Sequence, residues 1–204
     1  MQKSTSQNST LSTVDEIDRA RAREYALLAT LLSHSPDSRL LLGLAGLQGD
    51  ASAIGTAHAG LGEAARQVNE DSVRREYFDL FAGLGSQGGL LPYSSHYLTG
   101  ALYGRPLVRL REALAHLGIE RAAAESEPED HVAILCEIMS GLISGDIAGP
   151  PGADREFFEL HLAPWARRFF VDLEQAKSAD FYAAVGALGR IFVDVEIEAF
   201  AVSD

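Results

Sequence analysis

Residues 126–144 read SEPEDHVAILCEIMSGLIS, and this stretch joins a dense cluster of charge to a clearly apolar helical face. Its first six residues hold three carboxylates, a proline and a histidine. From Ile134 to Ile143 the apolar residues recur at steps of three and four, which is the spacing of a helix with one buried side. Proline is tolerated in a first helical turn because its missing N–H would have no partner there. The pattern predicts a helix from about Pro128 to Ser144 with one face in a core.

Similar spacing runs through the rest of the chain, and no alternating strand pattern interrupts it. The polar segment 1–12 is predicted to be disordered. We therefore expect an all-α fold in which residues 13–204 form a single compact bundle of about eight to ten helices. Pro164 is expected to kink or restart one of them. The other expected helical segments are about 14–32, 40–47, 51–68, 71–82, 96–118 with a pause at Gly104, 157–173 and 180–201.

The charge balance of the chain is strongly acidic. Its 17 Lys and Arg residues against 29 Asp and Glu residues give a formal net charge of −12. A nucleic-acid-binding protein needs basic surface to neutralise phosphates, so nucleic acid is not an expected partner. An acidic surface would instead attract a basic peptide or protein by electrostatic steering. Cys136 is the single cysteine, which excludes an intramolecular disulfide, and its apolar surroundings predict a buried thiol.

The sequence carries no recognised targeting, membrane or catalytic pattern. No apolar run approaches the roughly 18 residues that a membrane span needs, and the polar start lacks the features of a signal peptide, so we expect a cytoplasmic protein without a membrane span. The motifs of zinc proteases, serine hydrolases and paired-cysteine metal sites are absent from it. Glu127, Asp130 and His131 are suitably spaced to touch a metal, but no second helix supplies further ligands. We expect no enzyme activity, no cofactor and no metal.

The acidic turn before Val132 has two interpretations. Ser126 and Glu129 have the spacing of a capping box, which would explain the charges without any ligand. Alternatively, Asp130 and His131 stand at the edge of the buried helix face, where they would suit recognition of a guanidinium group or of backbone amides.

The glycine-rich segment from Gly83 to Tyr97 also has two interpretations. No Gly-Lys-Ser/Thr follows its glycines, so it is not a phosphate-binding loop. It is either a plain connector between helices or a mobile loop whose Pro92, Tyr93 and Tyr97 form the wall of a pocket. The aromatic residues between Phe157 and Phe170 have helical spacing and are expected in the core.

Three segments, in order, resemble the TorD/DmsD family of cytoplasmic chaperones for molybdenum-containing redox enzymes. EYFDLFAG at 76–83, followed by LPYSSHY at 91–97, is similar to the family's Tyr-x-x-Leu-Phe-x-Gly…Pro-Tyr-Glu-Ser-x-Tyr pattern. EPEDH at 127–131 resembles its Glu-Pro-x-Asp-His helix start. FELHLAPWARRF at 158–169 is similar to its His-Leu-x-x-Trp helix. Together the segments cover about residues 70–175.

The resemblance implies a chaperone that binds the twin-arginine signal peptide of a partner enzyme. It would hold this precursor until the molybdenum cofactor is inserted, and then release it for export. The implied partners are the leader peptide and the body of a molybdenum-containing oxidoreductase. Ser94 stands where the family usually has Glu, which removes one carboxylate from the loop. The implied peptide-binding residues are Pro92, Tyr93, Tyr97, Glu127, Pro128, Asp130 and His131, with Phe81, His161 and Trp165 in support.

Two other functions stay open from the sequence, namely a guanine-nucleotide-responsive switch and a purely structural assembly subunit. A monomer is expected, with helix exchange at the loops 83–89 and 145–152 as a route to a domain-swapped dimer. If the chaperone interpretation holds, replacing Asp130 or His131 by alanine is expected to weaken leader binding and leave the helical fold intact.

Overall fold

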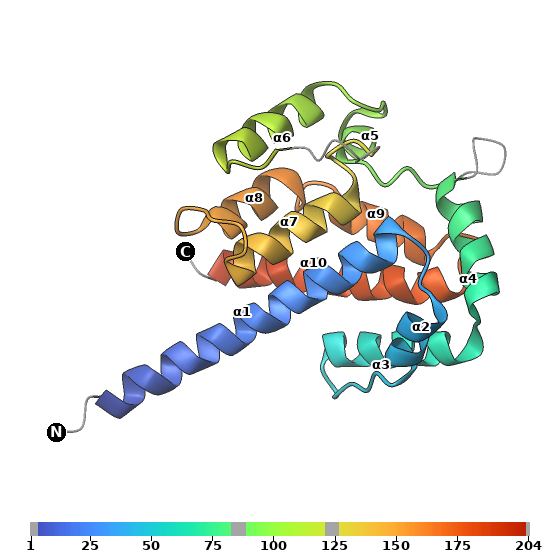
Figure 1. The fold of residues 1–204 in the computed structure, drawn as a ribbon, viewed down its shortest axis with the longest axis horizontal. Coiled ribbons are helices and arrows are strands. Elements are labelled where there is room, and N and C mark those ends of the chain that lie inside the picture. Colours follow the sequence, from blue (N-terminus) through green and yellow to red (C-terminus); the bar gives the residue numbers. More distant parts are fainter. Residues whose placement is uncertain (1–3, 83–88, 121–126, 203–204) are drawn as a thin grey trace.

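The apolar helix α10 (Phe181–Val202) lies at the centre of the fold. The computed structural model describes residues 4–82, 89–120 and 127–202. In Figure 1, α10 runs through the middle of the molecule, and it packs against helices of both halves of the chain. These neighbours are α1 (Ser4–Ser33), α3 (Ala53–Gln67), α4 (Glu70–Tyr77) and α9 (Ala166–Glu174).

The other helices cover this centre from several sides. Helix α7 (Val132–Ser144) packs along α1, and α8 (Ala153–His161) lies against α7. Helix α2 (Ser38–Ala45) packs on α3 at one end of the molecule, whereas α5 and α6 lie together at the opposite end (Figure 1). The bounds of this last pair are Ser94–Thr99 and Arg105–His116, and a π-helical turn, Phe78–Ala82, continues α4.

The expected all-α fold is confirmed, with ten α-helices in the described part of the chain. A break falls at Pro164 as expected, because α8 ends at His161 and α9 begins at Ala166. Helix α1 already begins at Ser4 and so includes residues 4–12, for which disorder was expected. Residues 4–12 are mostly polar, so their sequence lacks the apolar spacing that predicts a helix.

Two glycines let α10 approach α9 closely. A Cβ atom at Gly186 would lie 2.4 Å from the backbone nitrogen of Glu174 and 2.9 Å from the carbonyl oxygen of Phe170. At Gly189 it would lie 2.2 Å from the ring of Phe170, which is itself buried. A Cβ atom at either position would collide with α9, with its backbone at Gly186 and with the buried Phe170 ring at Gly189.

The amino end of α10 is capped by a residue far away in the sequence. The Glu76 carboxylate on α4 accepts hydrogen bonds from the backbone N–H groups of Asp180 and Tyr182, at 2.8 and 2.7 Å, and from that of Phe181 at 3.2 Å. A negative charge at this end also favours the helix dipole. Burial raises the pKa of Glu76, and the three hydrogen bonds oppose that rise. Glu76 thus ties α4 to the start of the central helix.

Cys136 lies in the core, as its surroundings predicted. Burial raises the pKa of its thiol to about 12, so the reactive thiolate is not formed near neutral pH. None of the described helices has the length and apolar character needed to cross a membrane.

The close contact of α9 and α10 can be tested with two glycine variants. Gly186→Ala is expected to lower the free energy of unfolding by about 1–3 kcal/mol, because the new methyl group meets backbone atoms that cannot move aside. Gly60→Ala on α3, where nothing lies within 4 Å, is expected to raise it by about 0.5–1 kcal/mol through better helix propensity. Urea denaturation measures both. Equal effects of the two variants would contradict the close packing.

Candidate functional site

The segment Pro92–Ser95 and the segment Asp130–Val132 meet and form what we call the junction. The Ser94 N–H donates to the carbonyl oxygen of Asp130 at 3.0 Å, and the Val132 N–H donates to that of Pro92 at 2.8 Å. Tyr93 and His131 form an isolated antiparallel bridge. The junction therefore brings together, through backbone hydrogen bonds, two of the three segments that carry the family resemblance.

Asp130 is completely buried within the junction, with 0% of its surface exposed. Its Oδ2 atom accepts hydrogen bonds from the Ser95 N–H at 2.8 Å and from the Ser94 hydroxyl at 3.3 Å. Tyr93, the N-cap of α5, makes no side-chain hydrogen bond to the start of this helix. Asp130, which is distant in the sequence, accepts a hydrogen bond from a backbone N–H there instead. The other oxygen, Oδ1, is buried without a hydrogen-bond partner among the described residues. The Asp130 carboxylate thus bonds to other groups of the protein and has no contact with solvent.

His131 caps its own helix and is 7% exposed. Its Nδ1 atom accepts a hydrogen bond from the Ala133 N–H at 3.1 Å. Helix α7 therefore begins at Val132 rather than near Pro128, and Ser126 of the expected capping box lies outside the described residues. When Nδ1 accepts, a neutral imidazole carries its proton on Nε2. In this state neither ring nitrogen accepts a hydrogen bond from a guanidinium group, so arginine recognition needs other groups.

Glu127 and Tyr93 lie next to His131. The Tyr93 hydroxyl donates a hydrogen bond to the Glu127 carboxylate, and the rings of Tyr93 and His131 meet edge to face with centroids 5.2 Å apart. Burial, followed by the hydrogen bond to Glu127, raises the pKa of Tyr93. Pro128 is half-buried and its carbonyl oxygen accepts from the His131 N–H at 3.1 Å. Glu129 points elsewhere and pairs with Arg111 at 2.8 Å.

The remaining predicted site residues belong to aromatic packing around the junction. Tyr97 is buried, its hydroxyl donates to Asp172 at 2.9 Å, and its ring lies 5.5 Å from that of Trp165. The Trp165 indole N–H donates to the carbonyl oxygen of His161 at 2.6 Å. Phe81 contacts the rings of Tyr77 and Tyr182. Pro92 is buried at the junction. These residues support the site and do not line the same groove as His131.

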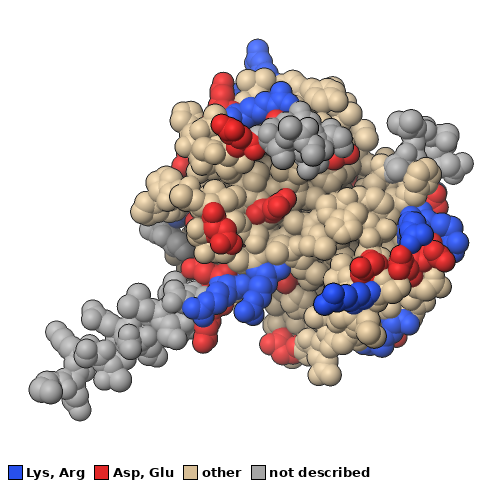
Figure 2. All heavy atoms as spheres, viewed as in Figure 1, with Lys and Arg blue, Asp and Glu red and all other residues tan. Residues whose placement is uncertain are grey.

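A groove with a volume of about 540 Å³ runs between α1 and α7 and begins at the exposed side of the junction. Glu127, His131 and Tyr77 line one end, and Glu137 lies further along α7. A neighbouring cavity of about 490 Å³ shares Ala26, Ser140 and Asp146 with it. Figure 2 shows both acidic and basic side chains over this face of the molecule. The opposite wall is formed by small residues of α1, namely Ala26, Ala29, Thr30 and Ser33, and by His34 directly after this helix.

The contribution of α1 was missed in the sequence, although a signal was present. Ala26, Ala29, Thr30 and Ser33 follow the three- and four-residue spacing of one helix face, and all four are small. Small residues on one face leave room beside a helix.

Among the described residues, no group of three or more His, Cys, Asp or Glu side chains is arranged to hold a metal ion. The loop glycines at 83, 85 and 88, which bear on the nucleotide and helix-exchange alternatives, lie outside the described residues.

Comparison with known proteins places this chain in a family. The family model described as nitrate reductase delta subunit matches residues 47–171, which include all three resembling segments. The chain belongs to this family. TorD and DmsD proteins are among its relatives, so the resemblance found in the sequence is confirmed.

Two curated relatives illustrate the similarity. The chaperone protein TorD of Vibrio cholerae serotype O1 is 28% identical over 137 residues, which are 63% of this chain and 62% of that protein. A Haemophilus influenzae protein named as the Tat proofreading chaperone DmsD is 26% identical over 121 residues, 58% of this chain and 57% of that protein. The chain thus spans less than two thirds of the length of these relatives. They are named as chaperones rather than enzymes, in agreement with the expectation for this chain.

A solved structure supports the fold. A protein from Archaeoglobus fulgidus, assigned to redox enzyme maturation, superposes with a TM-score of 0.54 at 22% identity. The superposition covers 85% of this chain and 93% of that protein.

The burial of Asp130 changes the expected result of replacing it. Asp130→Ala is expected to lower the free energy of unfolding by about 1–3 kcal/mol, because the buried Ser95 N–H loses its acceptor. Asp130→Asn keeps an acceptor oxygen and is expected to cost less. Asp79→Ala, at an exposed aspartate, should change stability by no more than about 0.5 kcal/mol. Chemical denaturation of the three variants measures this order, and an Asp130→Ala variant as stable as the Asp79→Ala variant would contradict it.

Proposed function

We propose that this protein is a maturation chaperone for a molybdenum-containing redox enzyme, and that it binds the twin-arginine leader of the enzyme precursor in the groove between α1 and α7. The observation that carries the proposal is the groove itself, which starts beside Glu127 and His131 and has carboxylates along one wall. Membership of the family and the chaperone names of the relatives support it. The net charge of −12 favours a basic ligand.

The two arginines of a leader would be recognised by carboxylates rather than by the imidazole. Glu127 lies at the junction end of the groove, and Glu137 is exposed on the same side of α7. Hydrogen bonds between guanidinium and carboxylate groups are about twice as strong as neutral ones. Since His131 uses Nδ1 to cap α7, its part is to shape the groove wall and to hold the helix start in place.

The apolar stretch that follows the arginines in a leader would lie further along the groove. Ile134 and Ile147 provide apolar surface there, and the small residues of α1 leave room for a peptide chain. Burial of this stretch would supply most of the affinity, whereas the arginines set the register. We expect a dissociation constant in the micromolar range or below, about −8 kcal/mol or better. Asp130 is a positioning residue in this scheme, because it acts through α5 and the junction.

As a chaperone of this kind, the protein would hold the precursor in the cytoplasm while the cofactor is inserted, and release it for export. Its partners would be the leader and the body of the enzyme, and we expect it to act as a monomer.

Leader binding can be tested with the leader peptides of the host's own molybdoenzyme precursors. Isothermal calorimetry is expected to give saturable binding to at least one of them, and the double variant Glu127→Gln/Glu137→Gln should weaken it about tenfold through the loss of two charge-assisted hydrogen bonds. Glu198→Gln, which removes an exposed carboxylate of α10, is the matched control and should bind like the parent.

The peptide provides a second control. Copies of the leader in which both arginines are replaced by glutamine should bind the parent protein about tenfold more weakly than the natural leader does. The double variant should bind these copies and the natural leader with equal affinity. If no leader binds with a dissociation constant below about 100 µM, the chaperone proposal fails. If leaders bind but the double variant binds them as well as the parent does, the groove is not the site.

A further inference from the structure

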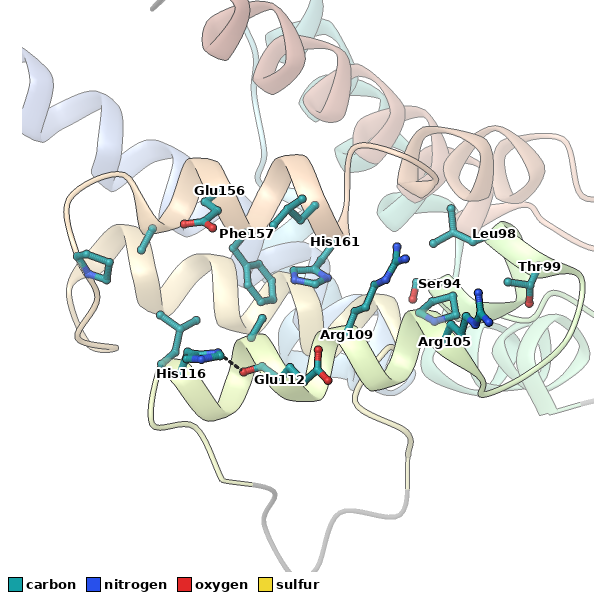
Figure 3. Close-up of a pocket in the computed structure, with 16 residues that line it drawn as sticks. Ser94, Leu98, Thr99, Arg105, Arg109, Glu112, His116, Glu156, Phe157 and His161 are labelled. Atoms are coloured by element: carbon teal, nitrogen blue, oxygen red, sulfur yellow. Dashed lines mark hydrogen bonds between the residues drawn. The ribbon is translucent and has the colours of Figure 1, made fainter.

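A second cavity, with a volume of about 760 Å³, lies between α6 and α8 and is closed at one end by α5 (Figure 3). No residue lines both this cavity and the groove between α1 and α7. Its volume falls in the range of about 300–1,000 Å³ that is typical of small-molecule sites. The proposed leader-binding function makes no use of it.

Much of the cavity wall is apolar. Phe157 provides an aromatic ring from α8, Ala113 and Leu117 line the side of α6, and Leu98 and Leu160 stand at the rim. These rim residues remain 43% and 59% exposed, which leaves apolar surface in water at the mouth of a cavity. Such surface is a common mark of a binding site. The walls therefore favour a ligand with an apolar body.

The end of the cavity near α5 is cationic. Arg105 and Arg109 lie one turn apart on the same face of α6, and neither has an ion-pair or hydrogen-bond partner among the described residues. Figure 3 shows Arg109 extending from α6 toward α8, where His161 faces it. Burial lowers the pKa of His161, so this ring is neutral near pH 7 and can exchange hydrogen bonds with a ligand without adding charge.

Several arginines of the protein have carboxylate partners, whereas Arg105 and Arg109 line a cavity without one. Arg111, on the other side of the same helix, pairs with Glu129 at 2.8 Å, and Arg190 pairs with Glu174 at 2.6 Å. In an acidic chain, two neighbouring guanidinium groups without carboxylate partners are well suited to a carboxylate, sulfonate or phosphate.

The two carboxylates of the cavity lie at different places. Glu112 follows Arg109 by about one turn of α6, whereas Glu156 stands near the start of α8, away from α5 (Figure 3). An anionic group is therefore attracted to the arginines at the α5 end of the cavity and repelled by Glu156 at the end where α8 begins. This division of charge gives a bound anion one preferred orientation.

We propose that this cavity binds a small organic anion with an apolar body. Its acidic group lies between Arg105 and Arg109 beside Ser94 and Thr99, and its body lies against Phe157 and the rim leucines.

The proposal can be tested with a matched pair of fluorescent probes. The anionic probe is 1-anilinonaphthalene-8-sulfonate, and N-phenyl-1-naphthylamine has the same rings without the sulfonate. The double variant Arg105→Gln/Arg109→Gln is expected to bind the sulfonate at least about tenfold more weakly and to bind the neutral probe like the parent. Arg39→Gln/Arg75→Gln, which removes two exposed arginines without partners in the described structure, is the charge-matched control and should bind both probes like the parent.

Two further variants locate the binding. Ala113→Phe fills the cavity and is expected to abolish saturable binding of both probes. Leu160→Glu changes an exposed rim residue, leaves the core untouched and is expected to weaken the sulfonate more than the neutral probe. The proposal is overturned if the Arg105/Arg109 double variant binds the sulfonate as the parent does, or if Leu160→Glu changes neither probe. Leader binding, measured in the same variants, should stay unchanged. Failure of the anion-binding proposal can therefore be distinguished from failure of the chaperone proposal.

Discussion

The candidate site depends on one constraint, namely that the backbone groups at the start of α5 and of α7 satisfy each other at the junction. Two backbone hydrogen bonds and the carboxylate of Asp130 connect Pro92–Ser95 to Asp130–Val132. An unpaired backbone group in this buried place would cost free energy. Separation of the two segments is therefore unfavourable. The groove lies on one side of this connection and the cationic cavity on the other, with His131 facing the first and Ser94 the second.

Much of the fold was predictable because its signals are local. The apolar spacing of α7 and the break at Pro164 can be read from neighbouring residues, and so can the burial of Cys136 and Trp165. The role of Asp130 could not be read in this way, since its hydrogen-bond partner Ser95 is 35 positions away. An acidic residue before a helix looks the same in sequence whether it faces solvent or caps another helix.

Resemblance to a family likewise identified the right segments without giving each residue its role. Glu76, in the first of them, caps α10, and Tyr77 in the same segment donates a hydrogen bond to the carbonyl oxygen of Leu32. Tyr97 and Trp165 pack against each other beside α9. Within these segments, residues that build the scaffold therefore stand beside residues that line the groove, and only the contacts separate them. The α1 wall of the groove lies outside all three segments.

The central position of α10 has a consequence for how the protein is made. Residues 181–202 leave the ribosome after α1, α3, α4 and α9, and they fill the space between these helices from both halves of the chain. Until they emerge, Glu76 has no helix start to cap, and the apolar faces of α3 and α9 that α10 covers have no partner. The core therefore closes only after translation of this helix, and the unfinished chain exposes apolar surface of the kind that cellular chaperones bind.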